Sequence, residues 1–242
     1  MGRAAPAPAV NAGAQSRRAH YLGALGIDCY VSRHAPAAAP VPMAVPATPR
    51  EPGPAGEWEA LRAEVAACTK CSLCETRTQT VFGVGDRRAR CLIVGEAPGA
   101  EEDRRGEPFV GRAGQLLDSM LRAVRLSRDT VFIANVLKCR PPGNRDPRPD
   151  EAASCLPYLE RQIALIEPAV MVAVGRVPAQ VLLGSDAAVA RLRGRVHQFG
   201  ERAIPLVVTY HPAYLLRAPA EKRKAWDDLK LARDLLDGRG AR

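Results

Sequence analysis

The chain has 242 residues, 47% of them hydrophobic, and carries a formal net charge of +9. This length suits one domain of moderate size with an appendage, and the hydrophobic content is sufficient for a buried core. No apolar run reaches the roughly 18 to 20 residues that span a bilayer, and the first residues lack the pattern of a secretion signal, so we expect a cytoplasmic protein with no membrane partner. The excess of arginine favours a polyanionic partner such as nucleic acid.

The first 56 residues differ in composition from the rest. Residues 1–18 and 35–56 are dominated by Ala, Pro and Gly, and such segments bury too little apolar surface to offset the entropy lost on ordering. We therefore expect residues 1–56 to be a largely disordered extension. Within it, residues 19–33 carry enough Leu, Ile, Tyr and Val to form a short ordered element or a docking peptide for a protein partner.

Residues 57–242 alternate between helical and strand patterns, which predicts one folded domain. Its first helix is indicated by Trp58, Leu61 and Val65 at helical spacing. Short apolar segments predict strands at 91–94, 131–135, 169–175 and 204–209, and further segments predict helices at 113–125, 149–167, 176–183 and 222–236. Strands that alternate with helices imply an α/β fold with a four-stranded parallel sheet covered on both faces.

The strand at 91–94 leads into a loop with a high density of acidic residues. The backbone turns at Gly95-Glu-Ala-Pro-Gly99, and Glu96, Glu101, Glu102 and Asp103 are crowded together, so that their carboxylates repel one another. Ligands sit at the carboxyl ends of strands in open α/β sheets, so this pattern indicates an active-site loop. An ordinary solvated acidic turn is the alternative.

Two other predicted strands are also followed by chemically useful side chains. Asn135 ends the second strand and His211 follows the fourth, so both should lie near Glu96 at one edge of the sheet. Phe109 adds a flat apolar surface, and the set suits a planar heterocycle with an amide-like edge. Each residue also has a structural explanation, because Asn135 can cap a turn, Phe109 can belong to the core and His211 can support the fold.

The seven cysteines predict a metal site in a reducing compartment, because their number is odd and several are closely spaced. Cys68 and Cys71 have C-x2-C spacing, and Cys139 and Cys155 lie sixteen positions apart. Four such thiolates can hold Zn²⁺ or a [4Fe–4S] cluster, and spacing alone does not choose between them. Cys74 extends the first motif by one more step. Unligated buried thiols are the alternative.

Several motifs make the chain similar to a known family. The match extends over about residues 68–229 and rests on Cys68-x2-Cys71, Val81-Phe-Gly-Val-Gly85, Gly95-Glu-Ala-Pro-Gly99, Gly106-Glu-Pro-Phe-Val-Gly111, Asn135-Val-Leu-Lys-Cys-Arg-Pro-Pro142, Cys155 and His211-Pro-Ala-Tyr-Leu-Leu-Arg217. On these residues the chain resembles the iron–sulfur uracil-DNA glycosylases of the type-four class found in bacteria and archaea. The resemblance implies a three-layer α/β/α domain that acts on uracil-containing DNA, and we expect a monomer.

The resemblance also implies a cofactor. It is a [4Fe–4S] cluster with a structural role, and the residues that match its ligands are Cys68, Cys71, Cys139 and Cys155. Cys74 has no place in this set.

Such an enzyme flips a deoxyuridine out of the helix and cleaves the bond from sugar C1′ to uracil N1, which leaves an abasic site. By the resemblance, His211 donates a hydrogen bond to uracil O2 and Phe109 stacks on the base. Asn135 reads the O4 and N3–H edge that distinguishes uracil from cytosine. The backbone of Gly95-Glu96-Ala97 would hold the other carbonyl.

Two positions depart from the better-known uracil glycosylases. Those enzymes have an Asp that positions the attacking water where this chain has Ala97. We therefore expect Glu96, or otherwise Glu102, to orient the water or to stabilise the sugar. Those enzymes also have a Tyr that bars the methyl group of thymine where this chain has Gly99, and we expect Glu102 to exclude thymine instead.

The same comparison suggests how DNA is held. Leu215 and Leu216 would form an apolar wedge that fills the gap left by the flipped base. Phosphate contacts are expected from Lys138, Arg140, Arg145 and Arg217, so binding should weaken steeply with salt. A related subgroup traps uracil-DNA covalently through a histidine after the second strand, and residues 138–150 contain none. We therefore do not expect covalent trapping.

Two competing functions are also compatible with the pattern. One is a non-catalytic iron–sulfur module that binds nucleic acid, and the other is a small α/β enzyme that acts on a free nucleotide.

Overall fold

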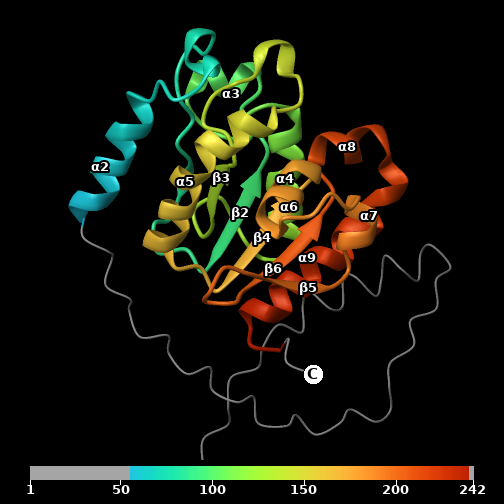
Figure 1. Cartoon of the computed structure of the whole chain (residues 1–242). Coiled ribbons are helices and arrows are strands. Elements are labelled where there is room, and N and C mark those ends of the chain that lie inside the picture. Colours follow the sequence, from blue (N-terminus) through green and yellow to red (C-terminus); the bar gives the residue numbers. More distant parts are fainter. Residues whose placement is uncertain (1–54, 240–242) are drawn as a thin grey trace, which may run out of the picture. The chain divides into compact units, whose positions relative to one another are not determined.

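The computed structural model describes residues 55–239, which form a six-stranded sheet between two layers of helices (Figure 1). The strand order is β1-β3-β2-β4-β6-β5. The four central strands are β2 (Cys91–Gly95), β3 (Phe132–Asn135), β4 (Val170–Val174) and β6 (Ile204–Thr209), and they pair in parallel with one another in the order β3-β2-β4-β6. These are the four strands predicted from the sequence, and the prediction of a parallel central sheet is confirmed.

The sheet has two further strands that the sequence analysis missed. β1 (Val84–Gly85) pairs antiparallel with β3, and β5 (Val196–Phe199) pairs antiparallel with β6. Residues of β5 alternate between exposed and half-buried, and β1 has only two residues, so neither shows the continuous apolar run of a central strand. The predicted number of four strands was therefore wrong for the whole sheet.

Helices cover both faces of the sheet, as predicted. On one face, α2 (Ala55–Ala66), α5 (Pro149–Ile166), α6 (Arg176–Leu183) and α7 (Val189–Leu192) contribute buried side chains to a shared core. On the other face, α4 (Arg112–Ala123) and α9 (Lys222–Leu236) pack against the alternate residues of the same strands. Because successive strand residues point to opposite faces, each strand supplies both cores. The resulting three layers are visible in Figure 1.

The short elements lie mostly at the carboxyl ends of the strands or beside them. They are the helices α3 (Ala100–Arg105) and α8 (Pro212–Arg217) and the 3₁₀ turns η1 (Ser72–Glu75), η2 (Pro142–Asn144) and η3 (Pro219–Glu221). The acidic segment after β2 was expected to be a loop, but part of it is α3. Glu102 explains this helix start, since its carboxylate accepts a hydrogen bond from the Gly99 N–H at 3.1 Å.

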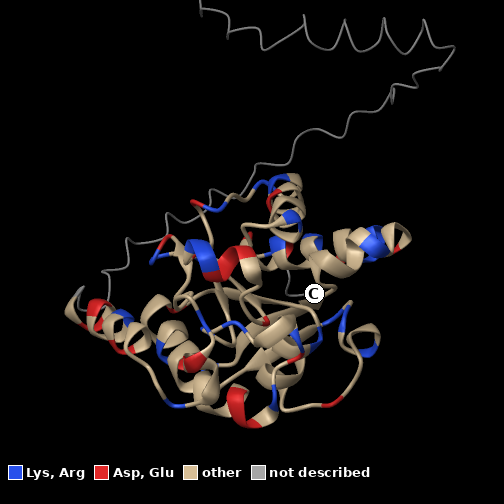
Figure 2. Ribbon diagram, turned by 90° about the horizontal axis from the view of Figure 1, so that it is seen from above, with Lys and Arg blue, Asp and Glu red and all other residues tan. Residues whose placement is uncertain are grey.

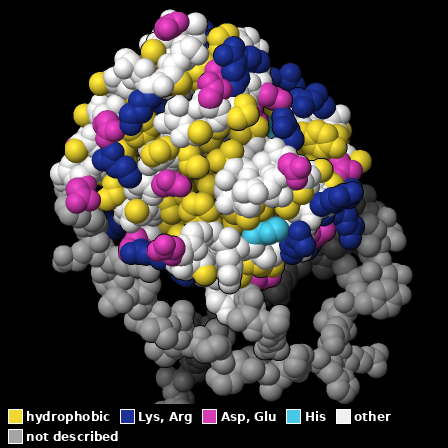
Figure 3. Space-filling model, viewed as in Figure 1, with side chains coloured by type: hydrophobic (Ala, Val, Ile, Leu, Met, Phe, Trp, Pro, Cys, Tyr) yellow, Lys and Arg dark blue, Asp and Glu magenta, His cyan; other side chains and the backbone are white. Residues whose placement is uncertain are grey.

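The first described helix, α2, begins at Ala55, and the division of the chain near residue 57 stays a prediction. The expected ordered element at 19–33, and with it nearly all of the predicted extension, lies outside the described residues. Between residues 55 and 239, none of the helices combines the length and the apolar character needed to cross a membrane. Figure 3 shows the face seen in Figure 1, on which apolar side chains gather near the middle with charged side chains of both signs around them.

Candidate active site

The carboxyl ends of the parallel strands border an open groove of about 880 Å³. The groove brings together Glu96, Asn135 and His211, which lie at the carboxyl ends of three different strands, and it adds Phe109 from the turn before α4. The arrangement expected from the sequence is therefore present. The groove is also lined by residues that the sequence analysis did not select as site residues, among them Asp146, Gly175, Arg176, Tyr210 and Tyr214.

Asn135 has an unsatisfied hydrogen-bond acceptor at the groove. The residue is only 2% exposed, and its Oδ1 atom is buried without a hydrogen-bond partner in the described part of the chain. A Cβ atom at Gly95 would lie 2.3 Å from this oxygen, so only glycine allows such an approach. A buried acceptor without a donor is destabilising by roughly 1–3 kcal/mol. Such an atom is well suited to accept a hydrogen bond from a ligand.

The Phe109 ring lies beside Gly95 and His211. Its centroid is 5.6 Å from that of the His211 imidazole with an interplanar angle of 29°, and a Cβ atom at Gly95 would approach the ring to 2.6 Å. Phe109 has a φ of 55°, in the left-handed region that L-residues avoid at a cost of roughly 1–2 kcal/mol. The surrounding contacts must therefore hold the backbone in this conformation.

His211 occupies the N-cap position of α8 with a defined tautomer. The Ala213 N–H donates a hydrogen bond to His211 Nδ1 at 3.1 Å, so in the neutral ring the proton resides on Nε2. Burial lowers the pKa of His211 to about 4, with the positive charge of Arg217 acting in the same direction and Glu102 opposing it. At neutral pH the ring is therefore an uncharged donor through Nε2–H.

Close packing behind His211 requires a glycine in the loop after β4. A Cβ atom at Gly175 would lie 3.1 Å from His211 Cβ, and its φ of 108° is unfavourable for other residues.

Two carboxylates of the predicted set differ in their surroundings. Burial raises the pKa of Glu96, and the nearby Asp146 raises it further, whereas Arg176 lowers it. The Glu102 carboxylate accepts hydrogen bonds from the backbone N–H groups of Gly99, Val110 and Gly111 at 2.9–3.1 Å. Glu102 therefore braces the loops at the groove, and Glu96 is the carboxylate better suited to act on water.

The residues predicted to contact DNA fall into two groups. Lys138 and Leu215 are each 1% exposed, so the prediction that they contact phosphate and intercalate was wrong for these two. Sequence spacing could not show this, because both belong to loops and short helices in which exposure depends on tertiary packing. Leu216 is 38% exposed, and Arg217 lines the groove.

The two other predicted phosphate ligands have protein partners. Arg140 Nε donates to Asn144 Oδ1 at 2.7 Å. Arg145 lines the groove but forms a two-point ion pair with the buried Glu151, with N–O distances of 2.6 and 2.9 Å. Both guanidinium groups are therefore partly committed within the chain.

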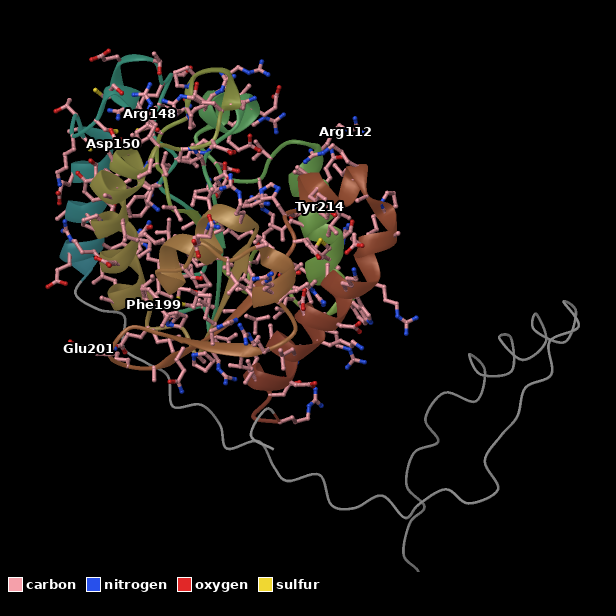
Figure 4. The ribbon with its side chains drawn as sticks, turned by 45° about the vertical axis from the view of Figure 1, so that its right-hand side comes forward. Arg112, Arg148, Asp150, Phe199, Glu201 and Tyr214 are labelled. Carbon is pink, nitrogen blue, oxygen red and sulfur yellow. The ribbon has the colours of Figure 1, made fainter. Side chains whose placement is uncertain are left out.

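Tyr214 was missed, although it lines the groove and is 38% exposed. It lies on α8, and Figure 4 shows it on the same side of the molecule as Arg112 at the start of α4. Its position three residues after His211 in the sequence was the one available signal. Viewed from above, Lys and Arg are spread over several elements and intermixed with Asp and Glu (Figure 2).

The cysteines predicted as metal ligands line a second, small pocket. Cys68, Cys71, Cys139 and Cys155 all contribute to it, and Cys74 is there too. Arg77 Nη1 lies 3.0 Å from Cys139 Sγ, and the Lys138 N–H donates to Cys155 Sγ at 3.2 Å. No group of three or more His, Cys, Asp or Glu side chains between residues 55 and 239 is arranged to hold a metal ion.

Lys138 places a buried positive charge beside this pocket. Its ammonium donates to the Asn135 carbonyl at 2.8 Å and to Gln162 Oε1 at 2.6 Å, both uncharged acceptors. Burial lowers the pKa of Lys138 to about 8. A buried cation without a carboxylate partner is costly, and anionic thiolates in the adjacent pocket would compensate it. The chemistry of these donors therefore suits a negatively charged metal–thiolate group, although the described side chains are not arranged as a metal site.

Comparison with known proteins agrees with this geometry. The family model of the uracil DNA glycosylase superfamily matches residues 82–230. The chain is 43% identical over 173 residues to a type-4 uracil-DNA glycosylase of Archaeoglobus fulgidus, which covers 69% of this chain and 87% of that relative. It is 40% identical over 187 residues to the type-4 uracil-DNA glycosylase of Thermotoga maritima. This alignment covers 75% of this chain and 96% of that relative.

A type-5 uracil-DNA glycosylase of Thermus thermophilus is 34% identical over 153 residues, which cover 54% of this chain and 68% of the relative. The similarity to type-4 enzymes is thus both higher and more extensive. The chain belongs to the uracil DNA glycosylase superfamily and, within it, to the type-4 uracil-DNA glycosylases.

Proposed function

We propose that the groove accepts a uracil base flipped out of DNA and that residues at its floor promote hydrolysis of the bond between uracil N1 and sugar C1′. As a type-4 uracil-DNA glycosylase, the chain excises uracil in DNA repair and leaves an abasic site. This membership favours catalysis on DNA over a non-catalytic nucleic-acid-binding module and over an enzyme of free nucleotides.

The unpaired Oδ1 of Asn135 is the observation that carries this proposal. Uracil presents an N3–H donor that would satisfy this oxygen. Cytosine has an unprotonated N3 at the same place, so its lone pair would face the lone pairs of Oδ1. A site built around a buried polar group rejects a ligand that leaves the group unpaired. Asn135 therefore supplies the choice of uracil over cytosine.

His211 stabilises the leaving group. As the glycosidic bond breaks, its electron pair moves onto uracil, and negative charge develops at O2. A neutral imidazole that donates from Nε2 stabilises this charge more in the transition state than in the substrate. The hydrogen bond from Ala213 keeps Nδ1 as the acceptor and so fixes the orientation of the ring.

Phe109 stacks on the uracil ring, and the Gly95-Glu96-Ala97 backbone holds the second carbonyl. Stacking is available because Gly95 leaves the Phe109 ring free of a side chain on that side. Position 99 is a glycine and has no side chain that could bar the methyl group of thymine. The Glu102 carboxylate lies beside this glycine. A Cβ atom at Gly99 would be 2.7 Å from Glu102 Oε2. We assign the exclusion of the thymine methyl group to this carboxylate.

Glu96 orients the water that attacks C1′. Burial raises the pKa of its carboxyl group, which makes the carboxylate a better proton acceptor than a solvated one. The water oxygen forms the new bond to C1′, and the proton that it loses passes to Glu96. The negative charge also stabilises the positive character that develops on the sugar.

DNA is held around the groove by side chains that the substrate can reach. We assign the apolar wedge to Leu216, with Tyr214 beside it, because both are exposed on α8. Arg217 contacts phosphate, and Arg140 and Arg145 do so with the guanidinium donors that their protein partners leave free. A monomeric state and a cytoplasmic location remain predictions.

We assign the cysteine pocket to a [4Fe–4S] cluster held by Cys68, Cys71, Cys139 and Cys155. As ligands, these residues would tie together the turn after α2, the loop after β3 and helix α5, and the cluster would have a structural role with no part in bond cleavage. Arg77 donates to one of these sulfurs, and Lys138 provides a compensating positive charge. Cys74 is left without a ligand role.

Cleavage of an oligonucleotide with one deoxyuridine tests the proposal. After alkaline scission of abasic sites, His211→Ala should show a rate lower by on the order of 10²–10³ than the unchanged protein. His197→Ala is the matched control, because His197 lies in β5, contacts the Leu192 carbonyl and does not line the groove. Equal rates for the two variants would remove His211 from the mechanism.

A further inference from the structure

The turn that carries Phe109 is held from two sides by charged side chains. On one side, the Glu102 carboxylate accepts hydrogen bonds from the N–H groups of Val110 and Gly111 at 2.9 and 3.1 Å. On the other side, the Arg128 guanidinium donates to the carbonyls of Phe109 and Pro108 at 3.1 and 2.6 Å. The backbone N–H groups of the turn are thus bound by a carboxylate, and its backbone carbonyls are bound by a guanidinium group.

Arg128 is itself held in place. It lies in the segment between α4 and β3, and its Nη1 atom also forms an ion pair with Asp118 on α4 at 3.1 Å. Its side chain is 24% exposed. A guanidinium group presents several donors in a fixed plane, so it can bind two successive carbonyls and a carboxylate at once. Among the side chains that the structure describes, no other cation donates a hydrogen bond to this turn.

The need for such a clamp follows from the conformation of Phe109. Its left-handed φ of 55° places the ring next to Gly95 and His211, whereas relaxation to a negative φ would turn the ring to another direction. The Phe109 carbonyl is also closely packed against the start of α4. A Cβ atom at Gly114 would lie 1.7 Å from this oxygen. The Phe109 carbonyl oxygen is therefore confined to one narrow position, and Arg128 donates a hydrogen bond to it there.

We propose that Arg128 is a positioning residue for base recognition: it holds Phe109 in the left-handed conformation in which the ring stacks on the flipped uracil. Arg128 does not line the groove, so it acts through Phe109. The proposal rests on the stacking role proposed for Phe109. It extends the uracil site to a residue nearly twenty positions further along the chain, outside the motifs that identify the family.

A double-mutant cycle on the full chain tests this coupling. Arg128→Met should lower kcat/KM for a single-stranded deoxyuridine oligonucleotide by about tenfold, the scale of one base–aromatic stack. Inhibition by free uracil should weaken by a similar factor. Phe109→Ala should lower kcat/KM at least as much, and adding Arg128→Met to it should change kcat/KM by less than about twofold. Arg122→Met, an exposed arginine on α4, is the matched control and should be neutral.

The thermal midpoint separates positioning from general support of the fold. Arg128→Met should lower it by the same amount with or without Phe109, whereas its effect on kcat/KM should depend on Phe109. An equal loss of kcat/KM in both backgrounds would overturn the proposal. A lower midpoint with unchanged kcat/KM and unchanged uracil inhibition would also overturn it.

Two additional measurements cover the other outcomes. If Arg128→Met does not fold, Asp118→Asn, which loosens Arg128 without removing it, should give a smaller loss with the same dependence on Phe109. If Phe109→Ala keeps full activity, the stacking role fails and the clamp is judged by structure alone. A crystal structure of Arg128→Met should then show Phe109 with a negative φ, and an unchanged φ would reject the clamp.

Discussion

Asn135 of the groove and Cys139 of the cysteine pocket are four positions apart in the sequence, yet the two regions treat polar atoms in opposite ways. At the groove, Asn135 Oδ1 is buried without a partner and His211 Nε2 has no hydrogen bond within the described part of the chain. At the pocket, Cys139 and Cys155 receive hydrogen bonds from Arg77 and from the Lys138 backbone. A site that must bind and release a substrate leaves donors and acceptors open, whereas a permanent structural site satisfies them within the chain.

Lys138 connects the two regions. Its ammonium binds the carbonyl of Asn135, and its backbone N–H binds the sulfur of Cys155. Despite this connection, substitutions in the two regions should change different properties of the protein. Changes at the groove should reduce activity with little loss of stability, and changes at the pocket should act first on folding.

The largest effect is expected at the pocket. Cys139→Ala should abolish iron binding and leave too little folded protein to assay, because a structural metal site can contribute on the order of 10 kcal/mol, comparable with the entire stability of a domain. Cys91→Ala is the control, since Cys91 is also buried but lies in the opposite core. Iron content per chain and urea unfolding measure both variants. A folded, iron-loaded Cys139→Ala protein would contradict the ligand assignment.

At the groove the expected loss is in catalysis. Asn135→Ala should lower kcat/KM on deoxyuridine DNA by about 10²–10³, because the N3–H of uracil loses its acceptor in a buried site. The free energy of unfolding should change by less than about 1 kcal/mol, since the substitution also removes an unsatisfied acceptor. Oligonucleotide cleavage and urea unfolding of the same preparation measure the two effects. A large loss of stability with normal kcat/KM would erase the contrast between the two regions.

The sequence predicted the central strands and both regions, but it did not predict the edge strands. The four central strands were recognised because they are short apolar runs, and the grouping of Glu96, Asn135 and His211 followed from their positions at strand ends. The edge strands were missed because β1 has only two residues and β5 alternates without a deep apolar face. The groove and the cysteine pocket could be predicted because residue spacing and the order of the strands can be read from the sequence.

Exposure in the loops could not be predicted in the same way. Lys138 was expected to contact phosphate, and therefore to be exposed, but its ammonium donates to two buried acceptors. Leu215 and Leu216 have the same chemistry and adjacent positions, and only the packing of α8 decides that one is buried and the other exposed. The role of Arg128 depends on contacts with residues 10 to 20 positions away, which no local pattern indicates.

The smallest expected effect is a pH dependence of stability that arises from His211 in the groove. The pKa of His211 is about 4 in the folded chain, below the ordinary value of 6.5, so between these values the unfolded chain binds the extra proton. Stability is therefore fully present above pH 6.5 and is lost as pH falls towards 4, by about 2 kcal/mol between pH 7 and pH 5. Urea unfolding of the unchanged protein and of His211→Asn at both pH values isolates this part. The variant should lose less stability than the unchanged protein by about that amount, and an equal loss would mean that the imidazole is not held in its neutral form.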